Sequence, residues 1–166
     1  MENEIIEKSI CKMFVLRGCP GSGKSTWAKQ FELDQIGKSS FIKIVSADQY
    51  FVRIDGTYFW NKEELPNAHK WCKNKAERWL QETVDWRNNL ALANQNYYLI
   101  VDNTNIKRRD FKEYVELANT YKFEVEEKIF GEFTEEAIQK YAERNIHNVP
   151  IETIRRMCNS LQNSLK

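Results

Sequence analysis

A glycine-rich segment near the start of the chain has the residue types and spacing needed to hold a phosphate group. Residues 18–25 read GCPGSGKS and match the pattern G-x-x-x-x-G-K-[ST] at every position. Glycines let successive backbone N–H groups turn toward one phosphate, and the helix expected next adds its positive dipole end. We expect Lys24 to reach the β- and γ-phosphates of ATP and the Ser25 hydroxyl to bind Mg²⁺. The predicted nucleotide-binding residues are Gly18, Cys19, Pro20, Gly21, Ser22, Gly23, Lys24, Ser25 and Thr26.

Two aspartates follow apolar runs that are expected to be strands. Asp48 comes after the run at 41–46, and Asp102 comes directly after the run at 97–101. Ligands of an open parallel sheet bind beyond the carboxyl ends of its strands. Phosphoryl transfer to a hydroxyl needs one carboxylate to accept the proton and another group to organise Mg²⁺. We therefore assign Asp48 as general base and Asp102 to the metal; a helix cap or a turn is the alternative role for each.

Arginines near the end of the sequence are candidates for holding the transferred phosphoryl group. Arg144 ends the penultimate predicted helix, within a segment at 134–158 that has the position of a helical lid. A guanidinium can clamp the charge that develops on phosphate oxygens, so Arg144 is the first candidate for a catalytic clamp. A solvated cation at a helix end is the alternative. Arg155 or Arg156, on the last predicted helix, is a further candidate to face the site.

Strands and helices alternate along the chain, which predicts an α/β fold with a parallel sheet of about four to five strands flanked by helices. Within the first helix, Trp27, Phe31 and Ile36 are expected to face inward. Trp86 departs from the main apolar stripe of the long helix, so exposure or stacking on a base is possible there. The predicted strands are 12–17, 41–46, 97–101 and 123–130, and the predicted helices are 24–36, 67–93, 108–121, 134–144 and one that starts near 150.

The length of 166 residues suits one domain, over 1–166, with 1–10 loosely held. The 25 Lys and Arg against 24 Asp and Glu argue against a broadly basic nucleic-acid binder. The sequence has no apolar run of about 20 residues and no apparent signal peptide, which predicts a cytoplasmic or nuclear protein without a membrane segment. His69 and His147 either touch substrate or pack as ordinary polar residues, and a structural zinc site is not expected. The cysteines are scattered and are expected to be reduced thiols: Cys11, Cys19, Cys72 and Cys158.

Several motifs, taken in order, resemble one family of kinases. The segments GCPGSGKSTWA at 18–28, VDNTN at 101–105 and VPI at 149–151 resemble the bacteriophage-type 5′-hydroxyl polynucleotide kinases. The middle of the chain is still more similar to the kinase module of the Nedd-four-binding-protein group. The segments that carry this similarity are SADQYF at 46–51, AHKW at 68–71, DNTN at 102–105 and RNIH at 144–147. The resemblance covers about residues 12–160.

The resemblance implies an adenylate-kinase-like P-loop fold and transfer of the ATP γ-phosphoryl to the 5′-hydroxyl end of RNA or DNA. The matching segments place acceptor-binding residues at His69, Asn103 and Asn105. Phage-type enzymes have an arginine three residues after the base, where this chain has Phe51, and Arg53 is the candidate substitute. No 3′-phosphatase activity is expected from these motifs. A small-molecule kinase acting on a nucleoside, sugar or antibiotic, and a non-catalytic ATP-dependent binding module, are the alternative functions.

Overall fold

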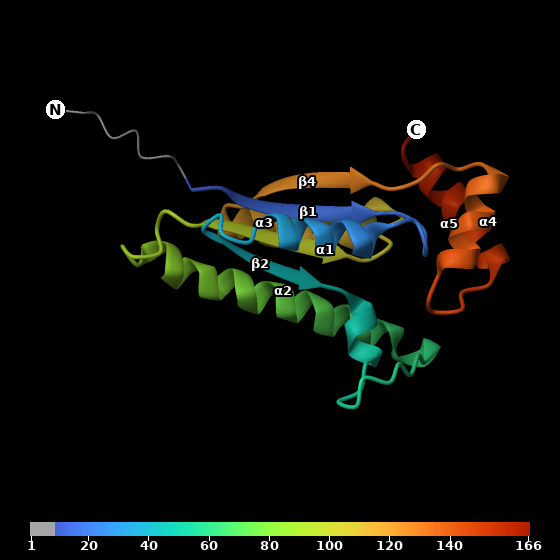
Figure 1. Ribbon diagram of the computed structural model, residues 1–166, viewed down its shortest axis with the longest axis horizontal. Coiled ribbons are helices and arrows are strands. Elements are labelled where there is room, and N and C mark those ends of the chain that lie inside the picture. The colour runs from blue at the N-terminus through green and yellow to red at the C-terminus, as the bar shows by residue number, and fades with distance from the viewer. Residues whose placement is uncertain (1–8) are drawn as a thin grey trace.

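Four apolar runs form one parallel sheet, which Figure 1 shows for the computed structural model of residues 9–166. β1 pairs with both β3 and β4, and β2 pairs with β3, so the strand order is β2-β3-β1-β4. All four strands end at the same edge of the sheet, as expected when each connection crosses over through a helix. The strands are β1 (Cys11–Arg17), β2 (Ser40–Val45), β3 (Asn96–Asp102) and β4 (Glu124–Ile129).

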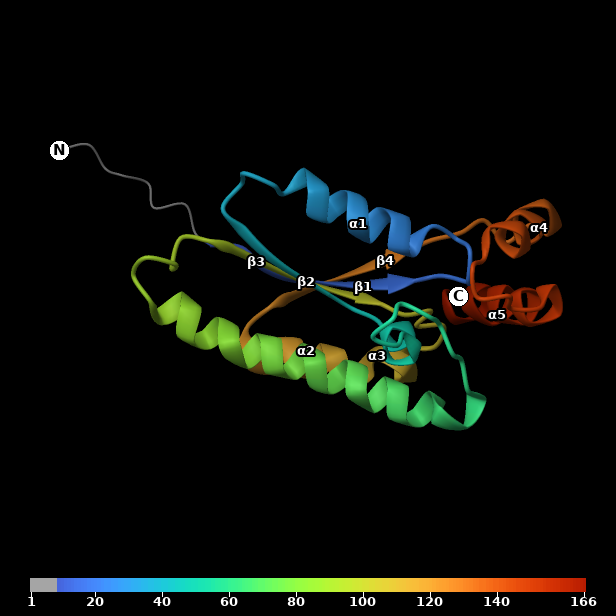
Figure 2. The same cartoon turned by 60° about the horizontal axis from the view of Figure 1, so that its bottom comes forward.

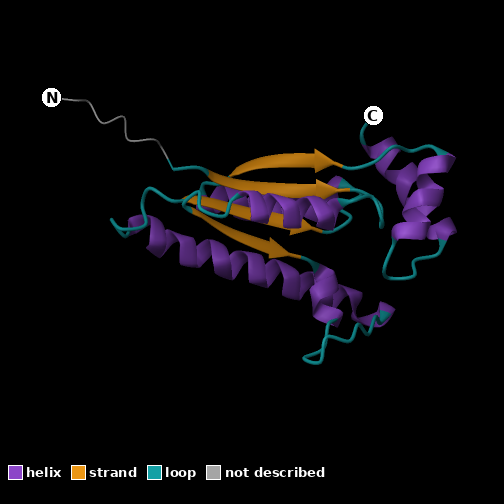
Figure 3. Ribbon diagram, in the orientation of Figure 1, coloured by secondary structure: helices purple, strands orange, loops and turns teal. Residues whose placement is uncertain are grey.

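Three helices cover the two faces of the sheet, and two more lie beyond its carboxyl edge. Figure 2 shows α1 on one face and α2 with α3 on the other, and the helices are coloured purple in Figure 3. Two short 3₁₀ turns, η1 (Ala47–Phe51) and η2 (Lys62–Glu64), lie between β2 and α2. The α-helices are α1 (Lys24–Asp34), α2 (Leu65–Asn88), α3 (Arg108–Tyr121), α4 (Glu135–Arg144) and α5 (Ile151–Ser164).

The inner strands are apolar on both faces because both faces are covered. On β1, Met13 and Val15 pack in the larger core under α2 and α3, whereas Phe14 and Leu16 pack under α1. These four side chains are buried, and their alternation between the two cores follows the two-residue period of a strand. The sheet is thereby fixed in register, which sets the positions of the residues that follow each strand.

Two predictions about aromatic and apolar side chains on the helices need correction. Trp27 and Phe31 pack against the sheet as expected, but α1 ends at Asp34 and Ile36 is 74% exposed. Trp86 is not free to stack on a base, because its ring packs 5.4 Å from that of Phe41. Trp86 packs against aromatic side chains of β2 and β3, a tertiary contact that helical periodicity alone does not include.

The long helix ends earlier than its apolar pattern predicts. α2 stops at Asn88, and Leu90, within the predicted helix at 67–93, is 94% exposed. The Asn89 side-chain oxygen accepts a hydrogen bond from the Ala91 N–H, which offers the backbone an alternative to another helical turn. No helix among the described residues is long and apolar enough to cross a membrane.

The predicted lid consists of α4 and α5, with α5 continuing six residues past the predicted limit of 158. The two helices share a small apolar cluster that includes Ile138, Tyr141 and Ile154. This cluster is separate from the two cores on the sheet faces, and it lies beyond the ends of the strands (Figure 1). Residues 1–8 lie outside the described part of the chain, and with them most of the segment expected to be loosely held.

Candidate active site

The phosphate loop connects the end of β1 to the start of α1. Gly23 takes a left-handed conformation (φ 100°) at the N-terminus of α1, which suits a residue without a Cβ. The Lys24 side chain is buried and its Nζ donates a hydrogen bond to the Cys19 carbonyl at 3.0 Å. Burial lowers the pKa of Lys24, while the negative charges of Asp102 and Asp48 oppose that shift. The lysine is thus folded over its own loop, within reach of the place where phosphate is expected.

The candidate Mg²⁺ ligands, Ser25 and Asp102, are in direct contact. The Ser25 hydroxyl donates to the Asp102 carboxylate at 2.6 Å. Burial raises the pKa of Asp102, and the hydrogen bond from Ser25 and the charge of Lys24 lower it in part. A hydroxyl beside a carboxylate fits Mg²⁺, which takes one or two protein oxygens and fills its octahedron with phosphates and waters. The buried Ser22 hydroxyl has no hydrogen-bond partner among the described residues, which also suits a loop built for an anion.

The candidate base, Asp48, lies in η1 just after β2. The Ser46 hydroxyl accepts a hydrogen bond from the Asp48 N–H, and Asn103 accepts one from the Ala47 N–H at 2.8 Å. The backbone is therefore fixed while the Asp48 side chain stays 55% exposed. Such a carboxylate is open to an incoming hydroxyl. Asn103 was expected to bind the acceptor, but its side-chain Oδ1 accepts the hydrogen bond from Ala47 and so holds this segment.

Two aromatic side chains that the sequence did not indicate as partners contact Asp48. The Tyr58 hydroxyl donates to Oδ1 at 3.3 Å, and His147 Nε2 lies 3.5 Å from Oδ2. Partial burial, together with the nearby Asp48 carboxylate, raises the pKa of the Tyr58 hydroxyl, which stays protonated as a donor. Tyr58 precedes two exposed aromatic residues and carried no motif, so no sequence signal singled it out. His147 was one of two open candidates for a substrate contact.

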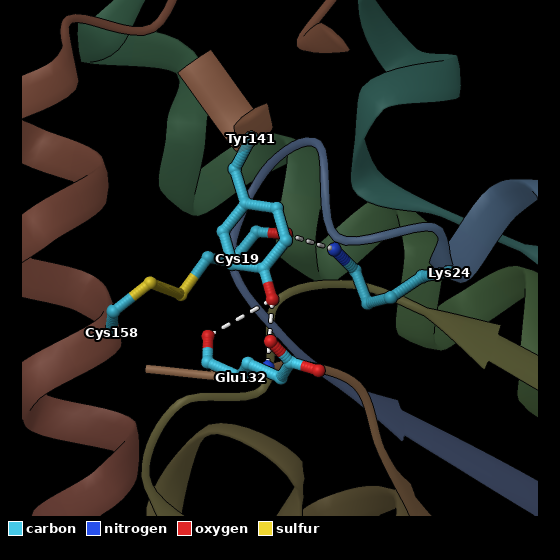
Figure 4. The surroundings of a disulfide bond; sticks show 5 residues. All are labelled: Cys19, Lys24, Glu132, Tyr141 and Cys158. Carbon is cyan, nitrogen blue, oxygen red and sulfur yellow. Dashed lines mark hydrogen bonds between the residues drawn. A yellow bond between two sulfur atoms is a disulfide. The ribbon is translucent and has the colours of Figure 1, made fainter. Parts of the chain in front are cut away.

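The first lid helix rests directly on the phosphate loop. A Cβ at Gly21 would lie 2.8 Å from the carbonyl carbon of Tyr141 in α4, closer than any side chain tolerates. Gly21 also has φ 78°, a second reason for glycine at this position. Figure 4 shows the Tyr141 ring over the loop, with its hydroxyl bonded to both backbone groups of Glu132.

A disulfide between Cys19 and Cys158 joins the phosphate loop to α5 (Figure 4). The expectation of four reduced thiols is therefore wrong for this pair, while Cys11 and Cys72 are free. The two cysteines are 139 positions apart in sequence and meet only because the lid folds back onto the loop. Spacing in the sequence does not reveal such a pair.

The basic residues of the lid have different surroundings. Arg144 is exposed at the end of α4, and its guanidinium lies 5.6 Å from the centre of the Tyr141 ring. Its side chain forms no ion pair within residues 9–166, so it remains available for a phosphate. Arg155 is instead held by Glu135 of α4 and Glu152 of α5, and the pair with Glu135 links the two helices. Arg155 is therefore not a free phosphate clamp.

The remaining predicted substrate residues do not all reach the same place. Asn105 is 2% exposed and donates to the Leu16 carbonyl, so burial excludes the expected contact with acceptor. Asn105 has a left-handed backbone conformation (φ 46°), which turns the chain in the segment after β3. His69 is exposed near the start of α2. Arg53 lies on a hairpin after η1, with its guanidinium 4.7 Å from the centre of the Phe59 ring.

Arg17, which the sequence analysis passed over, fixes the segment that follows Asp102. Its guanidinium is buried and donates to the carbonyls of Asn105 and Ile106 and to the Ser164 hydroxyl of α5. A charged residue at the end of an apolar strand was the available signal. Arg17 thereby connects the edge of the sheet, the loop that follows Asp102 and the end of α5.

The geometry can be compared with that of known proteins. A family model described as an AAA domain matches residues 13–163. Human NEDD4-binding protein 2 is 31% identical over 150 residues, which make up 90% of this chain and 8% of that protein. A chain in the structure of the Pnkp1/Rnl/Hen1 RNA repair complex is 21% identical, with a TM-score of 0.63 over 95% of this chain and 46% of its own. A second structure of the Pnkp1/Rnl/Hen1 complex gives a TM-score of 0.55 at 21% identity, over 82% of this chain and 39% of its own.

The chain thus spans less than half the length of these relatives. The resemblance to the Nedd-four-binding-protein group and to the P-loop polynucleotide kinases is confirmed. The parallel sheet with flanking helices is likewise the fold expected from the sequence. The chain belongs to the AAA domain family and has a P-loop kinase fold.

Proposed function

We propose that this chain is an ATP- and Mg²⁺-dependent kinase that transfers the γ-phosphoryl group to the 5′-hydroxyl of RNA or DNA. The observation that carries the proposal is the half-exposed carboxylate of Asp48, placed beyond the strand ends that also carry the phosphate loop. Burial lowers the pKa of Lys24 and the charge of Asp48 opposes part of that shift, so the two groups share one electrostatic environment. A base in front of a phosphate loop is the arrangement that transfer to a hydroxyl requires.

The chemistry assigns a separate task to each residue. The loop N–H groups, Lys24 and Arg144 hold the phosphates, and Ser25 with Asp102 holds Mg²⁺. Bound Mg²⁺ supplies neutralisation of the phosphate charge. Asp48 orients the acceptor hydroxyl and takes its proton as the new oxygen–phosphorus bond forms and the bond to the ADP oxygen breaks. The acceptor leaves with the phosphoryl group, and ADP is the second product.

An aromatic surface beside Asp48 favours a polynucleotide acceptor over a small molecule. Phe59 and Trp60 follow the hairpin that carries Tyr58, and both side chains are at least half exposed. Arg53 packs on the Phe59 ring, which adds a cation to the same surface. Exposed aromatic rings with nearby cations stack successive bases of a single strand. The presence of a similar chain in an RNA repair complex also supports an RNA end as acceptor.

The test is transfer of label from γ-labelled ATP to a panel of acceptors. The panel contains single- and double-stranded RNA and DNA with 5′-hydroxyl ends, together with nucleosides, sugars and aminoglycosides. Label on an oligonucleotide supports the proposal. Label on a small molecule alone would establish the small-molecule alternative. Tight ATP binding without transfer to any acceptor would identify a binding module.

The aromatic surface has its own test. Trp60→Ala removes one stacking platform, and we expect the KM for a 5′-hydroxyl oligonucleotide to rise about 5- to 100-fold with the KM for ATP unchanged. Ile36→Ala, an exposed apolar residue just beyond α1, is the matched control and leaves both constants unchanged. Equal oligonucleotide KM values for the two variants would remove the surface from the acceptor site.

A further inference from the structure

Two stacked rings from distant segments contact the Asp48 carboxylate, one ring at each of its oxygens. Tyr58 and His147 have ring centres 4.3 Å apart and planes inclined by 29°. The Tyr58 hydroxyl donates to Oδ1, and His147 Nε2 lies on the side of Oδ2. A stacked pair of this kind is stabilised by its own contact and limits the rotation of each ring. The carboxylate is therefore confined from two directions.

Tyr58 is placed by a tight hairpin. Val52 forms an antiparallel bridge with Tyr58, and the Arg53 N–H donates to the Thr57 carbonyl at 2.8 Å. Gly56 supplies the left-handed turn residue, with φ 83°. The Tyr58 hydroxyl is therefore fixed by local backbone structure that follows η1, the same turn that carries Asp48.

His147 is placed by an independent framework in the α4–α5 connection. The side-chain oxygen of Asn145 accepts hydrogen bonds from the His147 and Val149 N–H groups at 3.2 and 2.9 Å. The Asn145 amide in turn donates to the Val149 carbonyl, and Asn148 takes a left-handed conformation (φ 54°). Hydrogen bonds within the α4–α5 loop hold its backbone. His147 therefore contacts Asp48 because the lid lies against the site, and not because the His147 ring adjusts its own position.

We infer that His147 is a positioning residue for the general base, and that the lid loop completes the acceptor side of the site through it. This inference rests on the proposed function of Asp48. The remaining free face of the carboxylate is then directed at the acceptor hydroxyl, while Tyr58 and His147 hold its other side. A histidine that served only for packing would not need to direct a ring nitrogen at the carboxylate, whereas His147 Nε2 faces Asp48 Oδ2.

Steady-state kinetics with a 5′-hydroxyl oligonucleotide tests the inference. We expect His147→Leu to lower kcat about 10- to 100-fold with the KM for ATP unchanged, the loss typical of a misplaced catalytic group. His147→Gln keeps an N–H near the Nε2 position and restores most of the rate. Ile146→Ala, at the exposed neighbouring position in the same loop, is the control and leaves kcat unchanged.

A double-variant cycle separates positioning from an independent effect. If His147 acts through the base, His147→Leu has no further effect in the Asp48→Asn background. Losses that multiply in the double variant would overturn the inference, as would wild-type kcat in His147→Leu alone. Thermal unfolding of each variant shows whether a loss comes from misfolding, and Gln rescue identifies the nitrogen as the required group.

An NMR measurement keeps the inference testable even without turnover. The chain has two histidines, so the ring signals of His147 are assigned by their loss in His147→Gln. We expect Asp48→Asn and Tyr58→Leu to shift these signals at fixed pH and to leave the His69 signals in place. If no polynucleotide is phosphorylated, the proposed function fails on its own. If the His147 signals do not shift in either variant, the positioning role is wrong, irrespective of which acceptor the kinase uses.

Discussion

Replacing Gly21 by alanine tests whether α4 truly rests on the phosphate loop. The new Cβ would meet two obstacles: a left-handed backbone with φ 78°, and the Tyr141 carbonyl carbon at 2.8 Å. The first costs about 1–2 kcal/mol for an L-residue. The second requires α4 or the loop to move by roughly 1 Å, and overpacking of this kind costs about 1–3 kcal/mol. The free energy of unfolding should therefore fall by about 2–5 kcal/mol.

Gly37→Ala is the matched control for backbone strain. Gly37 has φ 81°, and a Cβ there meets no atom within 4 Å, so only the cost of about 1–2 kcal/mol applies. Thermal unfolding of the nucleotide-free variants measures the difference. At about 2–4 °C per kcal/mol for a chain of this size, Gly21→Ala should melt roughly 2–12 °C below Gly37→Ala.

Hydrogen exchange distinguishes a global from a local response to the Gly21 substitution. If the lid simply lifts from the loop, the melting temperatures converge but the amides of α4 lose protection. Equal melting temperatures for the two variants, together with unchanged protection of α4, would refute the contact between Gly21 and Tyr141. Either form of loss, by contrast, identifies the close approach as the cause.

Four further outcomes follow from the site. Asp48→Asn should lower kcat about 10²- to 10⁴-fold, while calorimetry should show a nearly unchanged affinity for ATP. Lys24→Ala should abolish transfer. Full activity in either variant would exclude the role assigned to that residue. Asp102→Ala should raise the Mg²⁺ concentration needed for half-maximal rate while the fold is retained by circular dichroism, and an unchanged Mg²⁺ requirement would exclude it as a ligand. Cys158→Ser should lower the free energy of unfolding by about 2–5 kcal/mol, because the disulfide joins positions 139 residues apart. The stability of this variant should not depend on a dithiol reductant. If the unfolding curve of the wild type were also unchanged by the reductant, the disulfide would be contradicted.

The sequence predicted the parts of the site that depend on local order. The pattern at 18–25 predicts the phosphate loop, and strand-end positions predict that Asp48 and Asp102 lie beyond the carboxyl edge of the sheet, where the structure places them. The strand limits agree within a residue or so because burial on both faces gives each strand a clear apolar run, whereas the ends of α1 and α2 fall short of the predicted limits. These features require only residues near one another in the chain.

The interactions that the sequence did not reveal depend on contacts between distant segments. Cys19 with Cys158, and Asp48 with His147, are each joined by the way the lid folds back over the strand ends. Asn105 was a candidate substrate residue because it lies in the DNTN segment at 102–105 that resembles the kinase family, but its side chain donates a hydrogen bond to the Leu16 carbonyl. A motif identifies residue types near a site and does not say which of them turn inward to support it.

The charges of β4 have a consequence for how this chain behaves beside other proteins. β4 pairs with β1 alone among the described strands, so it forms one border of the sheet. Glu126 and Glu127 on β4 form ion pairs with Lys12 and Arg17 of β1, on opposite faces. Charged side chains on a border strand discourage another chain from adding its backbone there. The charged border therefore disfavours edge-to-edge association of two sheets through β4.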